Sequence, residues 1–231
     1  TASGVALVGG GGNPKPGEIS LAHGGVLFLD ELPEYSRKVL DVLREPLESG
    51  RIVISRANRS TTFPARFQLI AAMNPCPCGY FGDPSGRCHC SQEQIRRYQG
   101  QTSGPLLDRI DLHIAVPPLP VAVLQQAPPS ESSELVQQRV ITARTRQIQR
   151  QGCPNAELSG AMRDRVCALQ GNDQTWLLDT IERLQLSARG YHRLLNVART
   201  IADLADADCI EKIHLMEALG YRSLDRYRQM T

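Results

Sequence analysis

The stretch Val26-Leu27-Phe28-Leu29-Asp30-Glu31 places two carboxylates directly after a run of apolar residues. An unbroken apolar run of this kind is typical of a strand that is buried on both faces of a parallel sheet. Ligands of open parallel sheets bind beyond the carboxyl ends of the strands. A carboxylate at that edge can hold Mg²⁺ while a second one polarises an attacking water, so the stretch indicates phosphoryl-transfer chemistry. The alternative is a strand that merely ends in two acids.

Two further apolar runs follow in the chain. Phe67–Met73 leads into Asn74, and Leu112–Val116 is a third candidate strand. Between the first two runs, Arg37–Glu45 is predicted to be a helix that ends at Pro46, because proline cannot continue a helix. Strands that alternate with helices are typical of a parallel α/β sheet. We therefore expect an α/β domain over residues 1–117.

A β-hairpin is expected inside this domain. Two β-rich stretches, Arg51–Ser55 and Ser60–Phe63, flank Asn58, which suits a tight turn. Arg56 and Arg59 then lie near the tip, where they either meet a phosphate backbone or are the solvated charges of an exposed turn.

The rest of the chain is predicted to be a linker and a helical bundle. Residues 118–132 are rich in Pro and Ser and read as a semi-extended linker. Residues 133–231 have helical patterns, and Ser187 is expected to cap a helix whose apolar face recurs with helical spacing. That face comprises Leu194, Val197, Ala198, Ile201 and Ala202. Arg139, Arg146 and Arg150 share another helix face, which is either plainly solvated or a stripe facing DNA or a second subunit.

Composition excludes several classes of protein. Of the 231 residues, 41% are hydrophobic and 22% are charged, which rules out a disordered chain or a collagen-like fibre. The longest apolar run, Leu69–Met73, is far shorter than the roughly 20 residues that a membrane span needs. Seven cysteines and no signal peptide favour reduced thiols or a metal site in the cytoplasm over a disulfide framework. The net charge of +2 does not by itself indicate a nucleic-acid partner.

Four of the cysteines form two C-x-C pairs, Cys76/Cys78 and Cys88/Cys90, separated by a glycine-containing loop. Four soft ligands can close a tetrahedral structural zinc site. The C-x-C spacing is tighter than the usual C-x₂-C, and free reduced thiols are the alternative.

Taken together, these motifs resemble AAA+ ATPases of the magnesium-chelatase-like branch that includes the ComM (YifB) competence proteins. The resemblance covers essentially the whole chain, and it is carried by Pro16–His23, Val26–Pro33, Ala71–Gly79, Ser103–Leu112 and Ser187–Leu204. It implies an AAA+ parallel α/β domain with a β-hairpin insertion, followed by an all-α lid bundle.

The resemblance also implies roles for individual residues. Asp30 would bind Mg²⁺, Glu31 would be the catalytic base, and Asn74 is similar to sensor 1. Arg109 resembles the arginine finger that reaches the nucleotide of the neighbouring subunit. Arg193 resembles sensor 2, which contacts ATP, with Arg189 as the rival candidate.

One motif of the family is absent, because no G-x-x-x-x-G-K-[ST] phosphate loop occurs in this sequence. Gly9–Gly12 is followed by Pro14 and Lys15, so it is expected to be a flexible loop and not a phosphate cradle. In the family the phosphate loop precedes this region. We therefore expect an incomplete AAA+ domain, the C-terminal part of a longer protein, that is inactive in isolation.

The function implied by the resemblance is that of a hexameric ATP-dependent DNA translocase or helicase. It would promote branch migration on single-stranded or branched DNA in natural transformation and recombination. Arg56 and Arg59 on the hairpin, and Lys15 within a second pore insertion over Leu7–Glu18, would contact the DNA. The alternatives are an ATP-driven protein remodeller, like the magnesium-chelatase motor subunit, and a non-catalytic interaction module stapled by zinc.

Overall fold

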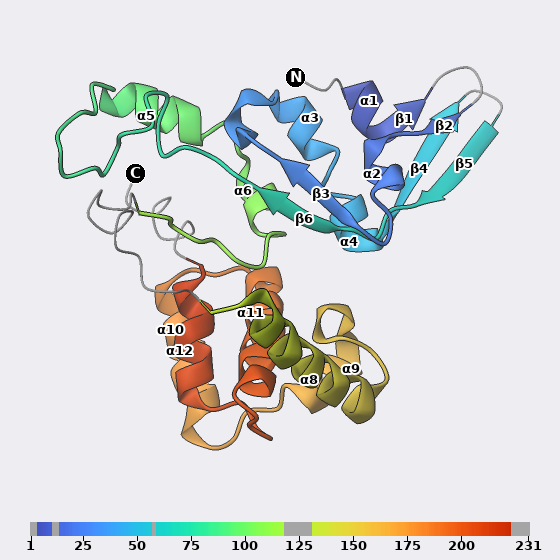
Figure 1. The fold of residues 1–231 in the computed structure, drawn as a ribbon, viewed down its shortest axis with the longest axis vertical. Coiled ribbons are helices and arrows are strands. Elements are labelled where there is room, and N and C mark those ends of the chain that lie inside the picture. The colour runs from blue at the N-terminus through green and yellow to red at the C-terminus, as the bar shows by residue number, and fades with distance from the viewer. Residues whose placement is uncertain (1–3, 11–13, 57–58, 118–130, 223–231) are drawn as a thin grey trace. The chain divides into compact units, whose positions relative to one another are not determined.

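The computed structural model describes residues 4–10, 14–56, 59–117 and 131–222, which Figure 1 colours from blue to red. The chain divides into two compact units, residues 1–110 and residues 111–231. The first is mixed α/β and the second is helical, so the expected fold class is confirmed.

The described part of the first unit contains three pairs of strands. The strand β3 (Val26–Leu29) runs parallel to β6 (Gln68–Ala71), with Leu29 opposite Ala71. The strands β4 (Arg51–Arg56) and β5 (Arg59–Pro64) pair antiparallel along their whole length. A short antiparallel pair joins β1 (Gly9–Gly10) to β2 (Lys15–Pro16). The parallel pairing of β3 with β6 is the arrangement that the alternating sequence pattern predicted.

Short helices precede, connect or follow these strands: α1 (Gly4–Val8), α2 (Glu18–Leu21), the 3₁₀ turn η1 (Leu32–Glu34), α3 (Arg37–Asp41), α4 (Pro46–Ser49), α5 (Gln92–Gln99) and α6 (Gly104–Leu107). The predicted helix Arg37–Glu45 is wrong in its length, because α3 ends at Asp41. Pro46 does not stop that helix but begins α4, where a proline at the first position lacks only an N–H that would have no partner in the helix.

The core of the first unit lies between the parallel pair and these helices. Its buried side chains include Leu7, Ile19, Leu29, Leu40, Leu43, Ile52 and Leu106. One expectation fails here, since β3 is not buried on both faces. Val26 and Phe28 are 54% and 59% exposed, as is Ile70 on β6 at 44%. Among the described residues, the opposite face of this strand pair is therefore left uncovered.

The third predicted strand, residues 112–116, is not formed. The backbone N–H of His113 instead donates to the carbonyl of Tyr221, at 2.7 Å. A strand requires a neighbour that pairs with successive backbone groups, and a single bridge between His113 and Arg222 does not provide one. Residue 113 therefore ties this segment to the end of the helical unit.

Gly9 and Gly10 form a strand and not the expected flexible loop, whereas Gly11 and Gly12 lie outside the described residues. Gly9 has a φ of +92°, and a Cβ there would lie 2.1 Å from the carbonyl oxygen of Lys15. Only glycine allows this close approach of two backbones.

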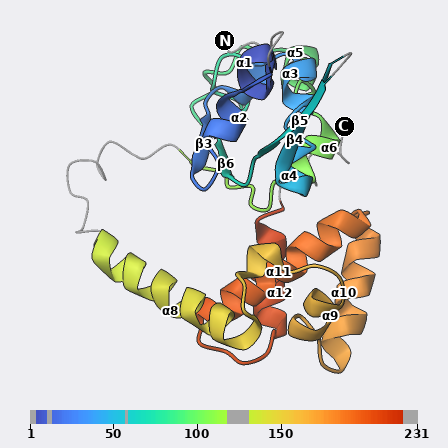
Figure 2. The same ribbon diagram turned by 90° about the vertical axis from the view of Figure 1, so that its right-hand side faces the viewer.

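The second unit contains α8 (Ser133–Gln151), the 3₁₀ turn η2 (Asn155–Glu157), α9 (Gly160–Val166), α10 (Asn172–Arg183), α11 (Ala188–Leu204) and α12 (Lys212–Gly220). Ser187 caps α11 as expected, because its hydroxyl accepts a hydrogen bond from the Gly190 N–H. The core is built around α11 and includes Leu177, Leu194, Leu195, Ala198, Ala202, Leu215 and Leu219. Figure 2 shows the first half of α8 lying apart from the other helices of this unit.

A buried polar network joins α8 to α11. Arg150 donates to both carboxylate oxygens of Asp203, at 2.6 and 3.0 Å, and Arg199 donates to one of them at 2.9 Å. Arg146 pairs with Asp206 and Asp208, beyond the end of α11. All three arginines expected on a solvated or DNA-facing helix face thus pair with carboxylates of this unit, because Arg139 pairs with Glu131. The sequence pattern missed these pairs because their partners lie elsewhere in the chain.

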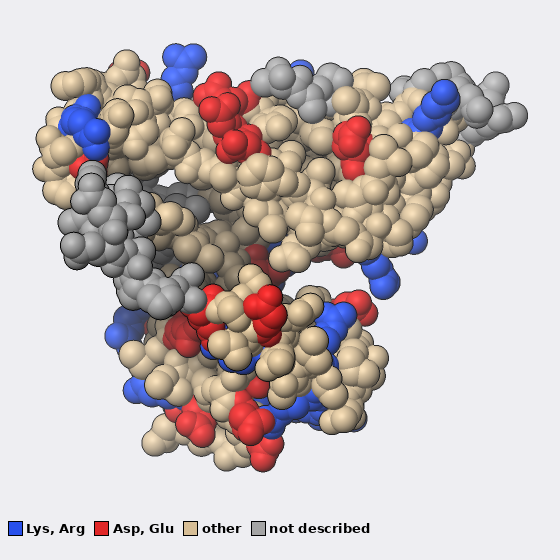
Figure 3. Space-filling view, in the orientation of Figure 1, with Lys and Arg blue, Asp and Glu red and all other residues tan. Residues whose placement is uncertain are grey.

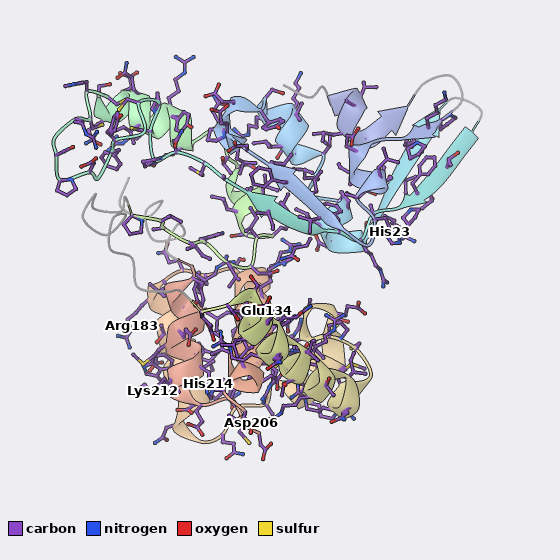
Figure 4. The ribbon with its side chains drawn as sticks, in the orientation of Figure 1. His23, Glu134, Arg183, Asp206, Lys212 and His214 are labelled. Atoms are coloured by element: carbon purple, nitrogen blue, oxygen red, sulfur yellow. The ribbon has the colours of Figure 1, made fainter. Side chains whose placement is uncertain are left out.

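The helix α12 is fixed at its start by a side-chain cap. The Nδ1 of His214 accepts a hydrogen bond from the Glu211 N–H, and Lys212 lies 4.9 Å from the ring centre of Trp176 (Figure 4).

In the described part of the chain, every helix is too short or too polar to cross a membrane.

Candidate functional site

The edge formed by the ends of β3 and β6 brings three predicted site residues together. The parallel register aligns Leu29 with Ala71, so Asp30 and Glu31 follow one strand where Asn74 follows the other. Two backbone hydrogen bonds continue the alignment beyond the strands: the Ala72 N–H donates to the Leu29 carbonyl and the Leu32 N–H to the Ala72 carbonyl, both at 2.9 Å. Asp30, Glu31 and Asn74 are all exposed at this edge.

Glu31 has an unusual backbone conformation. Its φ of 50° and ψ of 49° are left-handed, a region that non-glycine residues seldom occupy. The Glu31 N–H donates to a carboxylate oxygen of Asp30 at 2.9 Å. Backbone strain of this kind gathers at functional sites, where the surrounding structure enforces it. Figure 3 shows acidic side chains in the region where β3 ends in Figure 1.

Arg109, the arginine-finger candidate, follows α6 and is only 8% exposed. Its guanidinium donates to the Glu48 carboxylate at 2.5 Å and to the Pro105 carbonyl at 2.6 Å. Sequence reasoning missed Glu48, which lies on α4, far from Arg109 in the chain. The structure does not test the arginine-finger role, which stays a prediction.

The two sensor-2 candidates lie in the helical unit, on the first turns of α11. Arg193 donates to the Asp111 carboxylate at 2.6 Å, and Arg189 is half-buried. Asp111 is another partner that no local sequence pattern indicated. The choice between Arg189 and Arg193 stays open.

The residues predicted to contact DNA lie on two antiparallel strand pairs. Arg56 and Arg59 form the last backbone pair of the β4–β5 ribbon, next to residues 57–58, which lie outside the described residues. Lys15 is exposed on β2, opposite Gly10. Their role in binding DNA stays a prediction.

Cys76, Cys78, Cys88 and Cys90 converge in space. Their sulfur atoms all lie within 4.8 Å of one another. Three separations are 3.3 Å (Cys76–Cys78), 3.7 Å (Cys78–Cys88) and 3.8 Å (Cys76–Cys88). Four sulfurs bound to a tetrahedral zinc at about 2.3 Å would be about 3.8 Å apart. The cluster therefore has the ligand type, number and spacing of a possible metal site.

The thiols of this cluster influence one another's ionisation. A hydrogen bond from the Tyr80 backbone and then the Cys76 thiol lower the pKa of Cys78 to about 6. The pKa of Cys90 is raised to about 12, and the main cause is the hydrogen bond between Cys90 and Cys78. One thiolate thus forms easily, and further thiolates this close require a compensating cation.

The loop between the two cysteine pairs is ordered by its own contacts. Asp83 accepts hydrogen bonds from the Ser85 N–H and from Arg87, both at 2.8 Å. These bonds, with that from the Ser85 backbone first, lower the pKa of Asp83 to about 2. The Arg87 guanidinium also lies over the ring of Tyr80, 4.4 Å from its centre. The fold thereby holds the second cysteine pair close to the first.

Family models match nearly all of the chain. The model for magnesium chelatase, subunit ChlI, matches residues 1–124. The model for the C-terminal part of the same subunit matches residues 130–222.

Individual relatives agree with these matches. The chain is 53% identical over 98% of its length to an uncharacterized protein, YifB, of Salmonella typhimurium, and 53% identical over 99% to the competence protein ComM of Haemophilus influenzae. It is 26% identical over 87% of its length to the magnesium-chelatase 38 kDa subunit of Rhodobacter capsulatus. The chain spans 44%, 45% and 51% of these three relatives, respectively.

Proposed function

Since the chain belongs to the magnesium chelatase ChlI family, whose members are AAA+-type ATPases, we propose that it is part of the motor of an ATP-dependent DNA translocase. The proposed ATPase activity rests on one observation, the shared edge of β3 and β6. It brings the carboxylates of Asp30 and Glu31 to the same end of the sheet as the amide of Asn74.

The donor atoms at this edge suit Mg²⁺ and an attacking water, because carboxylate and amide oxygens are hard ligands and good proton acceptors. Bound with Mg²⁺, ATP supplies the phosphoryl group that is transferred to water. Asp30 would hold the metal, Glu31 would accept the proton of the water, and Asn74 would orient it. Arg189 or Arg193 would contact the same nucleotide from the helical lid.

We propose that Arg109 acts on ATP bound to a neighbouring subunit, within a hexameric ring. Its positive charge would stabilise the charge that develops on the transferred phosphoryl group. For that role its bond to Glu48 has to open. Ring assembly would therefore exchange one carboxylate partner of Arg109 for phosphate oxygens.

DNA as the substrate is supported by the β4–β5 ribbon and by the relative named as a competence protein. Arg56 and Arg59, repeated around a ring, would follow a phosphate backbone without reading its sequence. Lys15 would add a third cation per subunit. Such a motor would promote branch migration of single-stranded or branched DNA during natural transformation and recombination, in the cytoplasm.

The ribbon arginines provide the test of this substrate. In the full-length protein, the double variant Arg56→Ala/Arg59→Ala is expected to keep basal ATP hydrolysis and to lose its stimulation by forked DNA. The slope of log K for duplex DNA against log salt should become shallower by about 0.9 for each phosphate that the variant no longer neutralises. Arg51→Ala, at the other end of the same ribbon, is the control and should retain the stimulation.

Two other outcomes would redirect the assignment. If DNA leaves the hydrolysis of every variant unchanged, a protein remodeller is favoured, as the similarity to the magnesium-chelatase 38 kDa subunit suggests. If the full-length protein hydrolyses no ATP, the chain is a non-catalytic interaction module.

We further propose Zn²⁺ as the ion of the four-cysteine cluster. All four ligands come from this chain, so the zinc would be structural, and no coordination position would remain for catalysis.

A further inference from the structure

The cysteine cluster and the candidate nucleotide site meet at residues 74–76. Asn74 follows β6, and Cys76, two residues later, is fully buried. The chain then turns at Gly79, whose N–H donates to the Cys76 carbonyl at 3.0 Å. A Cβ on Gly79 would lie 3.9 Å from the side-chain oxygen of Asn74. The turn that carries the first cysteine pair therefore lies against the Asn74 side chain.

The helix α5 makes a second connection between the two sites. Its capping residue, Ser91, directly follows Cys90, and Ser91 and Gln94 form reciprocal capping hydrogen bonds. At its other end, the Gln99 side chain donates to the Pro75 carbonyl at 2.9 Å. A helix of eight residues is not stable alone, so its position depends on what holds its ends.

Tyr98, in the last turn of α5, completes this contact. The Asn74 backbone lies close enough to the Tyr98 hydroxyl to lower the pKa of Tyr98 slightly. Burial, followed by the negative charges of Glu34 and Glu31, raises the pKa of Tyr98 above its usual value. Tyr98 is therefore close to a candidate catalytic carboxylate, Glu31, and to the Asn74 backbone.

We propose that the cysteine lobe (residues 76–90), closed by a metal ion, fixes α5 so that Tyr98 and Gln99 hold Asn74 in position beside Glu31. Tyr98 and Gln99 are thus positioning residues, and the metal acts at a distance on the geometry of ATP hydrolysis. The proposal rests on the proposed function for its effect on rate. It also predicts a change in backbone protection that does not depend on any activity.

A bound metal ion would close the cysteine lobe into a loop. Without a metal ion, the cysteine lobe is closed by turn hydrogen bonds and by the contacts of Asp83 and Arg87, at its exposed tip. Four metal–sulfur bonds join Cys76 at its start to Cys90 at its end, and metal binding of this kind stabilises the local fold directly. Loss of the metal would free the start of α5 and loosen its hold on Asn74.

The test compares Cys88→Ser with Cys209→Ser in the full-length protein, purified without chelator. Cys209 is exposed in the helical unit and serves as the matched cysteine control. Zinc per chain, amide hydrogen exchange over residues 72–76 and 94–99, and the kcat and KM for ATP are measured. We expect Cys88→Ser to lose the zinc, to exchange faster in both segments, and to lower kcat by about tenfold to a hundredfold with little change in KM. Cys88→His, which keeps a zinc ligand, should restore all three properties.

Tyr98→Phe separates the positioning role from metal binding. It should retain one zinc per chain, expose the Asn74 amide to faster exchange, and lower kcat. Unchanged exchange at residues 72–76 after zinc loss would overturn the positioning role. A wild-type protein purified without bound zinc would overturn the assignment of a metal ion to the cysteine lobe. Absence of ATP hydrolysis would contradict only the proposed function, because zinc content and exchange still decide the inference.

Discussion

Glu31→Gln in the full-length protein is expected to reduce ATP hydrolysis by at least about a hundredfold, the usual contribution of a general base. The substitution keeps the size of the side chain and removes its ability to accept a proton at neutral pH. Glu31 is held in a left-handed backbone conformation at the end of β3, beside Asp30. The fold maintains this strained geometry at the position where the proposed mechanism needs a base.

ATP binding by the same variant is expected to stay close to that of the wild type, since Asp30 and the sensor candidates are unchanged. Single-turnover hydrolysis and equilibrium binding of ATP separate the two effects. Glu45→Gln, which changes an exposed carboxylate just before α4, is the control and should hydrolyse ATP at the wild-type rate. If Glu31→Gln retains more than half of the wild-type rate, Glu31 is not the base.

Asp203→Ala is expected to destabilise the helical unit by about 3–5 kcal/mol, which is the usual cost of removing one partner from a buried ion pair. Asp203 is 2% exposed and binds Arg150, Arg199 and Asn155. Its loss would leave Arg199, itself 1% exposed, as a buried charge without this carboxylate. Urea unfolding of the 231-residue chain, followed by the fluorescence of its only tryptophan, Trp176 in α10, measures the change.

The matched control is Asp208→Ala, which removes an exposed carboxylate paired with Arg146 and should cost about 0–1 kcal/mol.

The pH dependence of the free energy of unfolding gives a second measurement. Burial raises the pKa of Asp203, but hydrogen bonds from Arg150 and Asn155 and the charge of Arg199 outweigh burial and lower it. The stabilisation is therefore complete above the unfolded pKa of about 3.9, and it is lost as the pH falls through the folded pKa. Asp203→Asn should remove this acid dependence. Equal losses of unfolding free energy in Asp203→Ala and Asp208→Ala would contradict the stabilising role of the buried network.

Features that depend on local pattern could be predicted from the sequence. Apolar runs ending in Asp30-Glu31 and in Asn74 predicted two parallel strands, and β3 and β6 confirm them. The cap at Ser187 and the apolar face of α11 also follow from residues a few positions apart. Such signals are readable because strand alternation, helical spacing and capping each involve neighbours in the chain.

The partners of the charged side chains depend on contacts between segments that are distant in the chain. Arg109 pairs with Glu48, Arg193 with Asp111, and Arg150 with Asp203, each across more than fifty residues of sequence. Residues 112–116 have the composition of a strand, yet they form none, because strand formation depends on a neighbour and not only on propensity.

The four cysteines depend on both local pattern and contacts between segments. Their spacing indicated a possible metal site, but only the folded loop brings the sulfurs within 4.8 Å of one another. The contact of α5 with Asn74 had no sequence signal at all, since Tyr98 and Gln99 occupy ordinary positions in a short helix. Local pattern fixes the direction and periodicity of each segment, whereas contacts between segments depend on how all of them pack at once.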